Sequence, residues 1–339
     1  MKIIAWNCRG ALKAGFRRSV MHLKRIHNPT RLLILETKIS GPNAQEVADF
    51  LGFPKSCIIN LDGLVEGLWL LWDDSRLSMD ILSTNNQAIH VVIQVSNNPL
   101  FLFNWFFSGI YGRPQFEIRN MLWQELFAMA NIIQGPWMII GDFNDVVDQS
   151  VKFGGNEISQ TRAQDYLDCM NNCDMVDLGF IGNRFTWVNM RFSSQLIKER
   201  LDRVWANIDW KLSFPNASLF HLPCTHSDHC PILLDLNPLC PHSGSHPFLL
   251  EIFWIEHPDF QNIIHQVWVD TNSNSVKCVE LTTNQAKAWS LATFGNIFKK
   301  KKKLLAHIEG IQKSRAYNFS SFLWNLERGL LQQYNDILN

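Results

Sequence analysis

The sequence predicts an α/β fold in which two β-sheets pack face to face, with helices outside them and a helical extension at the C-terminus. Short apolar runs rich in Val, Ile, Phe and Trp alternate with polar turns over residues 1–237. Runs of this length and composition are typical of strands rather than of helices. Helical patterns interrupt these runs, and they dominate residues 248–339.

The predicted elements follow from the spacing of the apolar residues. Ten runs predict strands, at residues 2–6, 31–36, 68–72, 79–83, 88–95, 101–111, 137–141, 185–189, 200–205 and 231–236. Helical patterns between them lie at 43–53, 116–133 and 160–173, and further ones at 258–268, 284–312 and 322–338. The wide apolar stripe of residues 116–133 is expected of a half-buried helix.

The segment 238–247 is rich in Pro, Gly, Ser and His and predicts a linker. We therefore expect one domain at residues 1–237 and a helical connector at 248–339. The connector has long amphipathic helices and little core of its own, whereas a second catalytic domain would need its own core. With 339 residues, 46% of them hydrophobic, the chain is long enough to bury a substantial core.

The net charge is zero, but it is unevenly distributed. Residues 241–339 carry 10 Lys+Arg and 8 Asp+Glu of the chain's 31 of each, leaving 21 and 23 for residues 1–240. A slightly acidic body is unlike a non-specific nucleic-acid binder, which is usually basic. It suits a protein whose site carboxylates are compensated by a metal ion.

The sequence has no apolar stretch of about 18 residues, and its first apolar run is too short for a secretory signal, so we expect no membrane partner. The eight cysteines are scattered without a C-x-x-C pair, which favours a reducing compartment, nuclear or cytoplasmic. A zinc site is an alternative at HLPCTHSDHC (residues 221–230) together with Cys240 and His242. It is disfavoured because zinc ligands are usually paired more regularly.

Polar, chemically capable side chains stand at six ends of the predicted strands. They are Asn7, Glu36, Tyr111, Asp142 and Asn144, then Asp202, and finally Asp228 and His229. Each alone could be a turn former or a hydrogen-bonded core residue. Together they predict a binding site, because sites in sheet-based folds gather at such edges.

The segment GPWMIIGDFND, residues 135–145, presents Asp142, Asn144 and Asp145 together after a buried strand. Carboxylates this close in sequence repel one another unless a positive charge lies between them. We expect that charge to be a metal ion together with an imidazolium.

These residue types suit metal-assisted attack of water on a phosphate ester. Glu36 and Asp228 can offer carboxylate oxygens to Mg²⁺, and His229 can act as an acid, a base or a phosphate donor, oriented by Asp202. The neutral donors that can hold phosphate oxygens are Asn7, Tyr111 and Asn144. Asp142 can position the attacking water.

Seven motifs carry a family resemblance, in this order: WNCRG, LETK, SGIYGRP, IIGDFND, GNRFTW, RLDRVW and SDHCPILL. They resemble the endonuclease/exonuclease/phosphatase superfamily, the four-layer DNase I-like fold of DNase I and the apurinic-site endonucleases. More narrowly, they resemble the endonuclease domain of plant LINE-type non-LTR retrotransposon polyproteins, over residues 1 to about 237. The region beyond resembles the connector that leads to the reverse transcriptase in those polyproteins.

The resemblance implies a role for each matching residue. Glu36 would be the principal ligand of Mg²⁺ or Mn²⁺, with Asn7 and Asp228 close by. Tyr111 and Asn144 would contact the scissile phosphate of DNA, Asp142 the water, and Asp202 would pair with His229. The resemblance further implies that the nick leaves a 3′-hydroxyl and a 5′-phosphate.

The chain departs from the family pattern at several places. Glu66 stands where relatives commonly have Gly, and FLLEIFW, residues 248–254, lacks the Arg residues often seen there. There is no YADD-type motif, so we expect no reverse-transcriptase domain in this chain, and we expect a monomer.

Two basic segments bear on the substrate. Residues 1–35 contain eight Lys or Arg and no acid: Lys2, Arg9, Lys13, Arg17, Arg18, Lys24, Arg25 and Arg31. They form either a solvated helix face or a grip on the DNA backbone, with Arg9, Arg17 and Arg18 in contact. The run Lys299–Lys303 is a solvated connector, a nuclear-localisation signal or a tether.

Two other functions stay open from the sequence. The first is a phosphatase or lipid phosphodiesterase of the same fold, which would use the same catalytic set. The second is a catalytically silent remnant that at most binds nucleic acid.

Overall fold

A computed structural model of the chain describes residues 1–13, 15–60, 67–75, 78–94, 104–191, 195–238, 255, 257–270, 275–294 and 297–338. Their contacts define two compact units, one made of Met1–Cys240 with Leu305–Asn339 and the other of Pro241–Leu304. Glu66, Cys240, His242, the segment 248–254 and the predicted linker beyond residue 238 lie outside the described residues. The predicted domain boundaries stay predictions.

The larger sheet of the first unit has seven strands in the order β11-β15-β16-β1-β2-β4-β3. Its central strands β1 (Lys2–Asn7) and β2 (Arg31–Leu35) are parallel, whereas the neighbouring β16 (Ile232–Asp235) and β4 (Leu68–Trp72) are antiparallel to them. The remaining strands are β3 (Lys55–Ile59), β11 (Ile181–Gly182) and β15 (Ser218–His221).

The second sheet has six strands in the order β10-β14-β8-β7-β6-β5. Here β7 (Asn104–Tyr111) and β8 (Trp137–Asp142) are parallel, and β14 (Asp202–Asn207) is antiparallel to β8. The other strands are β5 (Ser78–Thr84), β6 (Ala88–Gln94) and β10 (Met175–Asp177). A small third sheet contains β12 (Trp187–Val188), β13 (Lys198–Glu199) and β9 (Lys152–Phe153).

The main core lies between the two large sheets. Alternate residues of β1 and β2, such as Ile3 and Leu33, meet alternate residues of β7 and β8, such as Phe107 and Ile140, and all four are fully buried. Because successive residues of a strand point to opposite faces, the residues between them point outwards. Both faces of these strands are covered, which explains their unbroken apolar sequences.

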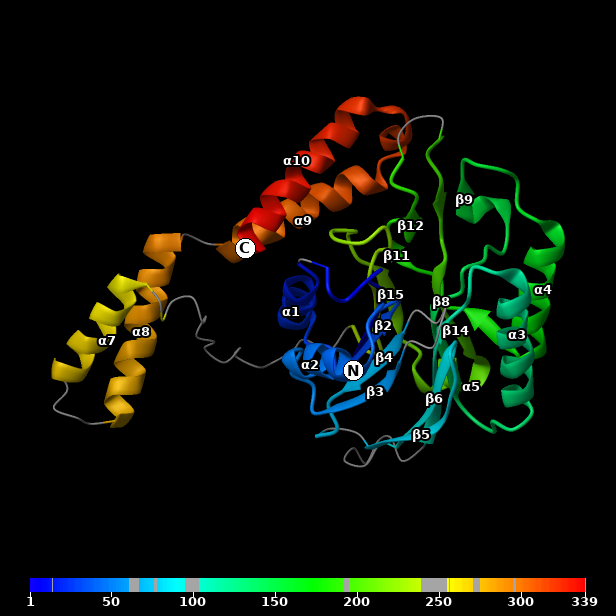
Figure 1. The fold of residues 1–339 in the computed structure, drawn as a ribbon, viewed down its shortest axis with the longest axis horizontal. Helices are drawn as coiled ribbons and strands as arrows, with labels where there is room; N and C mark the ends of the chain where they lie inside the picture. The colour runs from blue at the N-terminus through cyan, green and yellow to red at the C-terminus, as the bar shows by residue number, and fades with distance from the viewer. Residues whose placement is uncertain are drawn as a thin grey trace. The chain divides into compact units, whose positions relative to one another are not determined.

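Helices cover the outer face of each sheet (Figure 1). They are α1 (Phe16–His27) and α2 (Gly41–Phe50) on one side, and α3 (Phe116–Ala130) and α4 (Gln160–Asn172) on the other. Ile34 of β2 packs in one cluster with Val47 of α2, and Ile139 of β8 packs in another with Leu122 of α3. The predicted sandwich of two sheets between helices is confirmed.

Most predicted elements are present, and the differences have physical reasons. The helix α1 was not predicted, because its many cations mask a short apolar stripe that includes the buried Phe16 and Val20. The edge strand β3 is only half-buried and therefore lacks an apolar run. The helix predicted at residues 284–312 is two helices, α8 (Ser275–Phe294) and α9 (Ile297–Lys313).

Shorter elements and the C-terminal helices complete the fold. They are η1 (Gln149–Val151), α5 (Ile208–Ser213), α7 (Pro258–Asp270), η3 (Arg315–Phe319) and α10 (Ser321–Leu338). In the second unit α7 and α8 pack through Phe260, Ala286 and Trp289. Within the part of the chain that the structure describes, every helix is too short or too polar to cross a lipid bilayer.

Candidate active site

Strand register brings the predicted site residues together. Asn7 at the end of β1 lies opposite Leu35 of β2, so Glu36 follows directly beside it. Tyr111 at the end of β7 lies opposite Asp142 at the end of β8, and Asp142 in turn lies opposite Asp202, the first residue of β14. The two sheets therefore end at one place, where their polar residues meet.

The backbone at this place is unusual. Four residues other than glycine have left-handed φ angles: Arg9 (50°), Glu36 (51°), Lys38 (55°) and Asn144 (49°). Such conformations are sparsely populated by L-residues and cluster at functional sites in proteins. The turns that follow β1, β2 and β8 thus hold their side chains at some expense in backbone energy.

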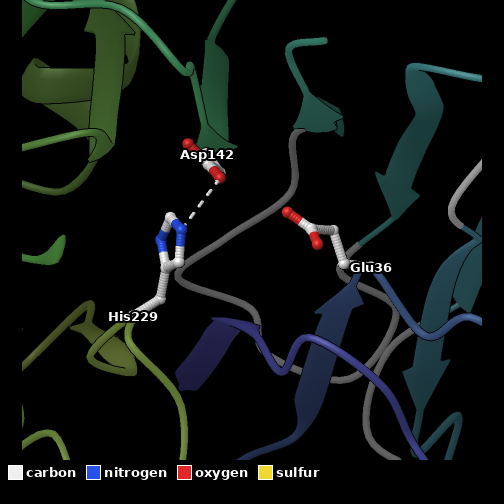
Figure 2. Close-up of side chains that lie close together, drawn as sticks. All are labelled: Glu36, Asp142 and His229. Carbon is white, nitrogen blue, oxygen red and sulfur yellow. Dashed lines mark ion pairs between the residues drawn. The ribbon is translucent and has the colours of Figure 1, made fainter. Parts of the chain in front are cut away.

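Asn7 links the two buried carboxylates of the site. Its Nδ2 donates to Oε1 of Glu36 at 2.8 Å and to Oδ2 of Asp142 at 2.9 Å, and the hydroxyl of Tyr111 donates to Oε1 of Glu36 at 3.1 Å. All four side chains are buried. Figure 2 shows Glu36 and Asp142 converging with His229 from three separate segments.

His229 lies between two carboxylates. Its Nδ1 is 3.0 Å from Oδ2 of Asp202, and its Nε2 is 3.7 Å from Oδ2 of Asp142. Burial alone would lower the pKa of His229, but the charges of Asp202 and Asp142 outweigh it and raise the pKa to about 9. The ring is therefore an imidazolium at neutral pH.

The two carboxylates next to Asn7 have pKa values shifted in opposite directions. Burial, reinforced by the charge of Asp202 and partly offset by His229, raises the pKa of Asp142 to about 7. Burial also acts to raise the pKa of Glu36, but the hydrogen bond from Asn7 and the charges of Arg9 and Lys38 lower it below its ordinary value. Lys38 Nζ and Arg9 Nε lie 3.1 and 3.5 Å from Oε2 of Glu36.

Asp228 has partners of its own. Its Oδ2 accepts a hydrogen bond from Nε1 of Trp187 at 3.0 Å, and Nη1 of Arg9 lies 3.4 Å from the same oxygen. Arg9 therefore bridges Asp228 and Glu36. Sequence reasoning missed the contributions of Lys38 and Trp187, although both stand in motifs that carry the family resemblance, LETK and GNRFTW.

Asn144 is fixed by hydrogen bonds. Its backbone N–H donates to Oδ1 of Asp142 at 2.9 Å, and its Nδ2 donates to the carbonyl of Gly112 at 2.9 Å. The glycine is needed there, since a Cβ would lie 2.5 Å from the carbonyl oxygen of Phe143. The turn that follows β8 thus holds Asn144 beside Asp142.

Asp145 does not share a cation with Asp142, contrary to our expectation. Its Oδ2 accepts from Nη2 of Arg119 at 2.6 Å and lies 3.4 Å from Nη2 of Arg162. Arg119 lies on α3 and is fully buried. The positive charge near Asp142 is the imidazolium of His229, and that near Asp145 is a guanidinium that anchors the turn to the helices.

Two cations of the basic N-terminal stretch also make contacts within the fold, and their predicted contact with DNA stays a prediction. Arg17 lies 3.6 Å from the carboxylate of Glu46 and over the ring of Phe50, and Lys24 donates to the carbonyls of Leu51 and Gly52. These two cations thus hold α1 against α2 and the turn after it. Arg18 is exposed on the same helix, and Arg25 is exposed in its last turn.

Two cysteines flank the segment that carries Asp228 and His229. Cys224 and Cys230 are joined by a disulfide, so their sulfurs are not thiolates that could bind zinc. The other residues proposed for that site, Cys240 and His242, lie outside the described residues. The reducing compartment stays a prediction.

The donor set at the centre of the site fits a hard divalent cation. Glu36, Asp142 and His229 each present one potential ligand atom, all within 4.8 Å of one another. Magnesium prefers carboxylate oxygens, which Glu36 and Asp142 provide. The pKa of about 9 and the contact with Asp202 keep His229 protonated, so it would act as a hydrogen-bond donor next to a bound cation rather than as a ligand.

Comparison with solved structures identifies the fold. No protein-family model and no curated protein sequence matches the chain. The chain shares its fold with solved AP endonucleases, which confirms the predicted DNase I-like sandwich.

Particular solved structures show how far this likeness extends. The apurinic-site endonuclease of Leishmania major superposes with a TM-score of 0.51 at 14% identity, over 69% of this chain and 86% of its own. The catalytic domain of Xenopus laevis APE2 gives 0.51 at 15%, over 69% and 91%. The endonuclease domain of TRAS1, a telomere-specific non-LTR retrotransposon, gives 0.49 at 12%, over 70% and 97%.

Proposed function

We propose that the protein is a metal-dependent phosphodiesterase that nicks DNA. The observation that carries this proposal is the convergence of Glu36, Asp142 and His229, with Asp202 behind the ring, from four segments far apart in the sequence. Two acids with shifted pKa values and an imidazolium at one buried point are the groups that phosphate-ester hydrolysis requires.

Magnesium is the ion that the residues suit best, with Mn²⁺ as an alternative. Glu36 would hold it, with its carboxylate oriented by Asn7, and Asp142 would act on the attacking water. When bound, such an ion polarises the phosphoryl oxygen and stabilises charge on the leaving oxygen. Asp228, which the sequence also offers to the metal, has its Oδ2 in contact with Trp187 and Arg9.

The protein's own residues supply the remaining chemistry. Asp142, with a pKa of about 7, changes protonation near neutral pH, as a group that accepts a proton from water should. The imidazolium of His229 stabilises negative charge on the phosphate, and Asp202 keeps it protonated. Tyr111 and Asn144 lie beside the carboxylates and would contact the phosphate.

DNA is favoured over a small phosphate ester by the charges around the site and by the order of the seven motifs. Arg9 and Lys38 are about 40% exposed and lie at the site itself, where they can contact phosphates next to the reacting one. We further propose, on the motifs, a retrotransposon origin and a product with a 3′-hydroxyl, the end that a polymerase can extend as a primer.

Supercoiled plasmid provides the test. The full chain should convert it to the nicked circle with Mg²⁺ and not with EDTA. Glu36→Ala should reduce nicking by orders of magnitude, whereas the matched control Glu157→Ala, at an exposed position between β9 and α4, should not. Undiminished nicking by Glu36→Ala would remove Glu36 from the site.

Two further assays define substrate and product. Hydrolysis of inositol phosphates or lipid headgroups much faster than DNA cleavage would refute the assignment to DNA. A DNA polymerase with labelled nucleotides should extend the nick directly. Extension that requires a prior 3′-phosphatase treatment would show that the other ester bond is broken.

A further inference from the structure

The loop from Cys224 to Cys230, here called the catalytic loop, carries Asp228 and His229. Its far end is bound to the main body of the domain. The N–H of Val188 donates to the carbonyl of Asp228 at 3.0 Å, the N–H of Cys230 to that of Thr186 at 2.7 Å, and Nε1 of Trp6 to that of His229 at 3.1 Å. These bonds fix the loop on the side of β1 and β12.

The near end of the loop is bound to the C-terminal helices. Gln312 of α9 donates from Nε2 to the carbonyl of Cys224 at 3.1 Å and accepts from the N–H of Cys224 at 3.2 Å. One buried side chain thus satisfies both backbone polar groups of Cys224, as a neighbouring strand would. The two residues are 88 positions apart.

Gln312 is itself held in a buried polar network. Its Nε2 also donates to Oε1 of Glu327 of α10 at 2.7 Å, and the hydroxyl of Tyr317 donates to Oε2 of the same carboxylate. Burial, together with Glu327, raises the pKa of Tyr317 well above its ordinary value, so the phenol remains a donor. Nζ of Lys198 lies 4.0 Å from the centroid of the Tyr317 ring and ties the network to β13.

Packing alone does not fix the near end of the loop. A cavity of about 110 Å³ adjoins it, lined by Cys224, Ser227 and Trp187 on one side and by Gln312 and Glu327 on the other. Where the loop borders this cavity, its position depends on the hydrogen bonds of Gln312 and on the Cys224–Cys230 disulfide. With the disulfide reduced, loss of Gln312 would remove the partner of both backbone polar groups of Cys224 and leave the loop room to move.

We propose that Gln312 is a positioning residue for the reaction and that residues 305–338 complete the active site instead of only connecting it to something else. The inference rests on the proposed nuclease function. Gln312 touches no reacting group. It acts through Cys224 on the loop that places His229 against Asp202 and Asp142, where a displacement of about 1 Å can lower the rate about a hundredfold.

The experiment uses the full chain with Gln312→Leu, which removes the hydrogen bonds at similar size. The control is Gln332→Leu on α10, whose exposed amide bonds only to Asp336 one turn away. Nicking is measured against DNA concentration in reducing buffer, so that the disulfide does not hold the loop. We expect kcat to fall about tenfold to a hundredfold with KM unchanged, and the control to match the wild type.

A second variant decides the question if Gln312→Leu does not fold. Glu327→Gln keeps the size of the side chain and disturbs the network more gently, and it should lower kcat several-fold, again at constant KM. An unchanged kcat in a folded variant overturns the inference, and so does a rise in KM alone, which would indicate a DNA-contact role. Absence of nicking by the wild type would instead overturn the proposed function.

Discussion

Replacing Asp202 by Asn tests the electrostatics of the site with a minimal change in shape. The side chain keeps its volume and an oxygen that can accept from Nδ1 of His229, now 3.0 Å away, and it loses one negative charge. The charge of Asp202 is the larger of the two that hold a proton on the buried ring. Its removal leaves burial, which favours the neutral imidazole, opposed by Asp142 alone.

The expected magnitude follows from the pKa of His229. A rise from 6.5 to about 9 corresponds to about 3 kcal/mol in favour of the imidazolium. Without Asp202 the pKa should return to about 6.5 or lower, so at pH 8 the protonated fraction falls from about nine-tenths to about one-thirtieth. Because Asp202 also raises the pKa of Asp142, its loss lowers that pKa and keeps Asp142 deprotonated at more acid pH.

The sign of the pH dependence is therefore fixed. In the wild type the imidazolium is present below about pH 9 and is lost above it, so the alkaline fall in rate lies near pH 9. In Asp202→Asn this fall should move to about pH 6.5 or below, with nicking at pH 8 reduced at least about thirtyfold and the deficit shrinking towards pH 6.

The assay is the initial rate of plasmid nicking at saturating Mg²⁺ from about pH 5.5 to about pH 9.5. Asp209→Asn, at an exposed position of α5, is the control for loss of one carboxylate. A variant-to-wild-type rate ratio that stays constant across this range would refute the reasoning, since it would mean that the imidazolium is not used.

Three further predictions concern the scaffold and the DNA grip. Gly141→Ala puts a Cβ 1.9 Å from the carbonyl oxygen of Ile110 and should lower the free energy of unfolding by about 3 kcal/mol or more in urea melts. The control Gly135→Ala has open space around its Cβ and should lower it by only about 1–2 kcal/mol. Equal losses of stability in the two variants would contradict the clash. Arg119→Met leaves the buried Asp145 without its main partner and should lower the free energy of unfolding by about 3–5 kcal/mol. The double variant Arg119→Met/Asp145→Asn should recover most of this stability. A double variant as unstable as Arg119→Met would show that the packing of Arg119 dominates. Neutralising the exposed Arg18 and Arg25 should flatten the salt dependence of DNA binding, measured by fluorescence anisotropy, without changing the melting temperature, whereas an unchanged salt slope would leave these residues as a solvated face.

The fold could be predicted in outline because its central strands are covered on both sides. The runs around Ile34 and Ile139 have four successive apolar residues, and neither a surface strand nor an amphipathic helix has that pattern. Where one face meets solvent the signal fades, as in β3. Helix α1 was missed because cations such as Arg17 and Lys24, which look like surface residues in the sequence, mask its short apolar stripe.

The members of the site could be predicted from the strand ends, but their pairing could not. Asp142 and Asp145 look equivalent in the motif, and only the turn decides that one faces His229 and the other Arg119. Gln312 gives no signal at all, since an exposed-looking Gln on an amphipathic helix is ordinary. Its role depends on a contact between segments 88 residues apart, which local pattern does not encode.

The left-handed backbone at Arg9, Glu36, Lys38 and Asn144 has a consequence for the selection that acts on these four positions. A residue other than glycine in that conformation costs the fold about 1 kcal/mol, and glycine would relieve the strain at each position. A chain under selection for stability alone would drift towards glycine there, and the strain is tolerated only while the side chains themselves are useful. Four such positions around one carboxylate cluster therefore set stability against activity. Single glycine replacements that raise the melting temperature but slow DNA nicking would indicate that the sequence is under selection for catalysis.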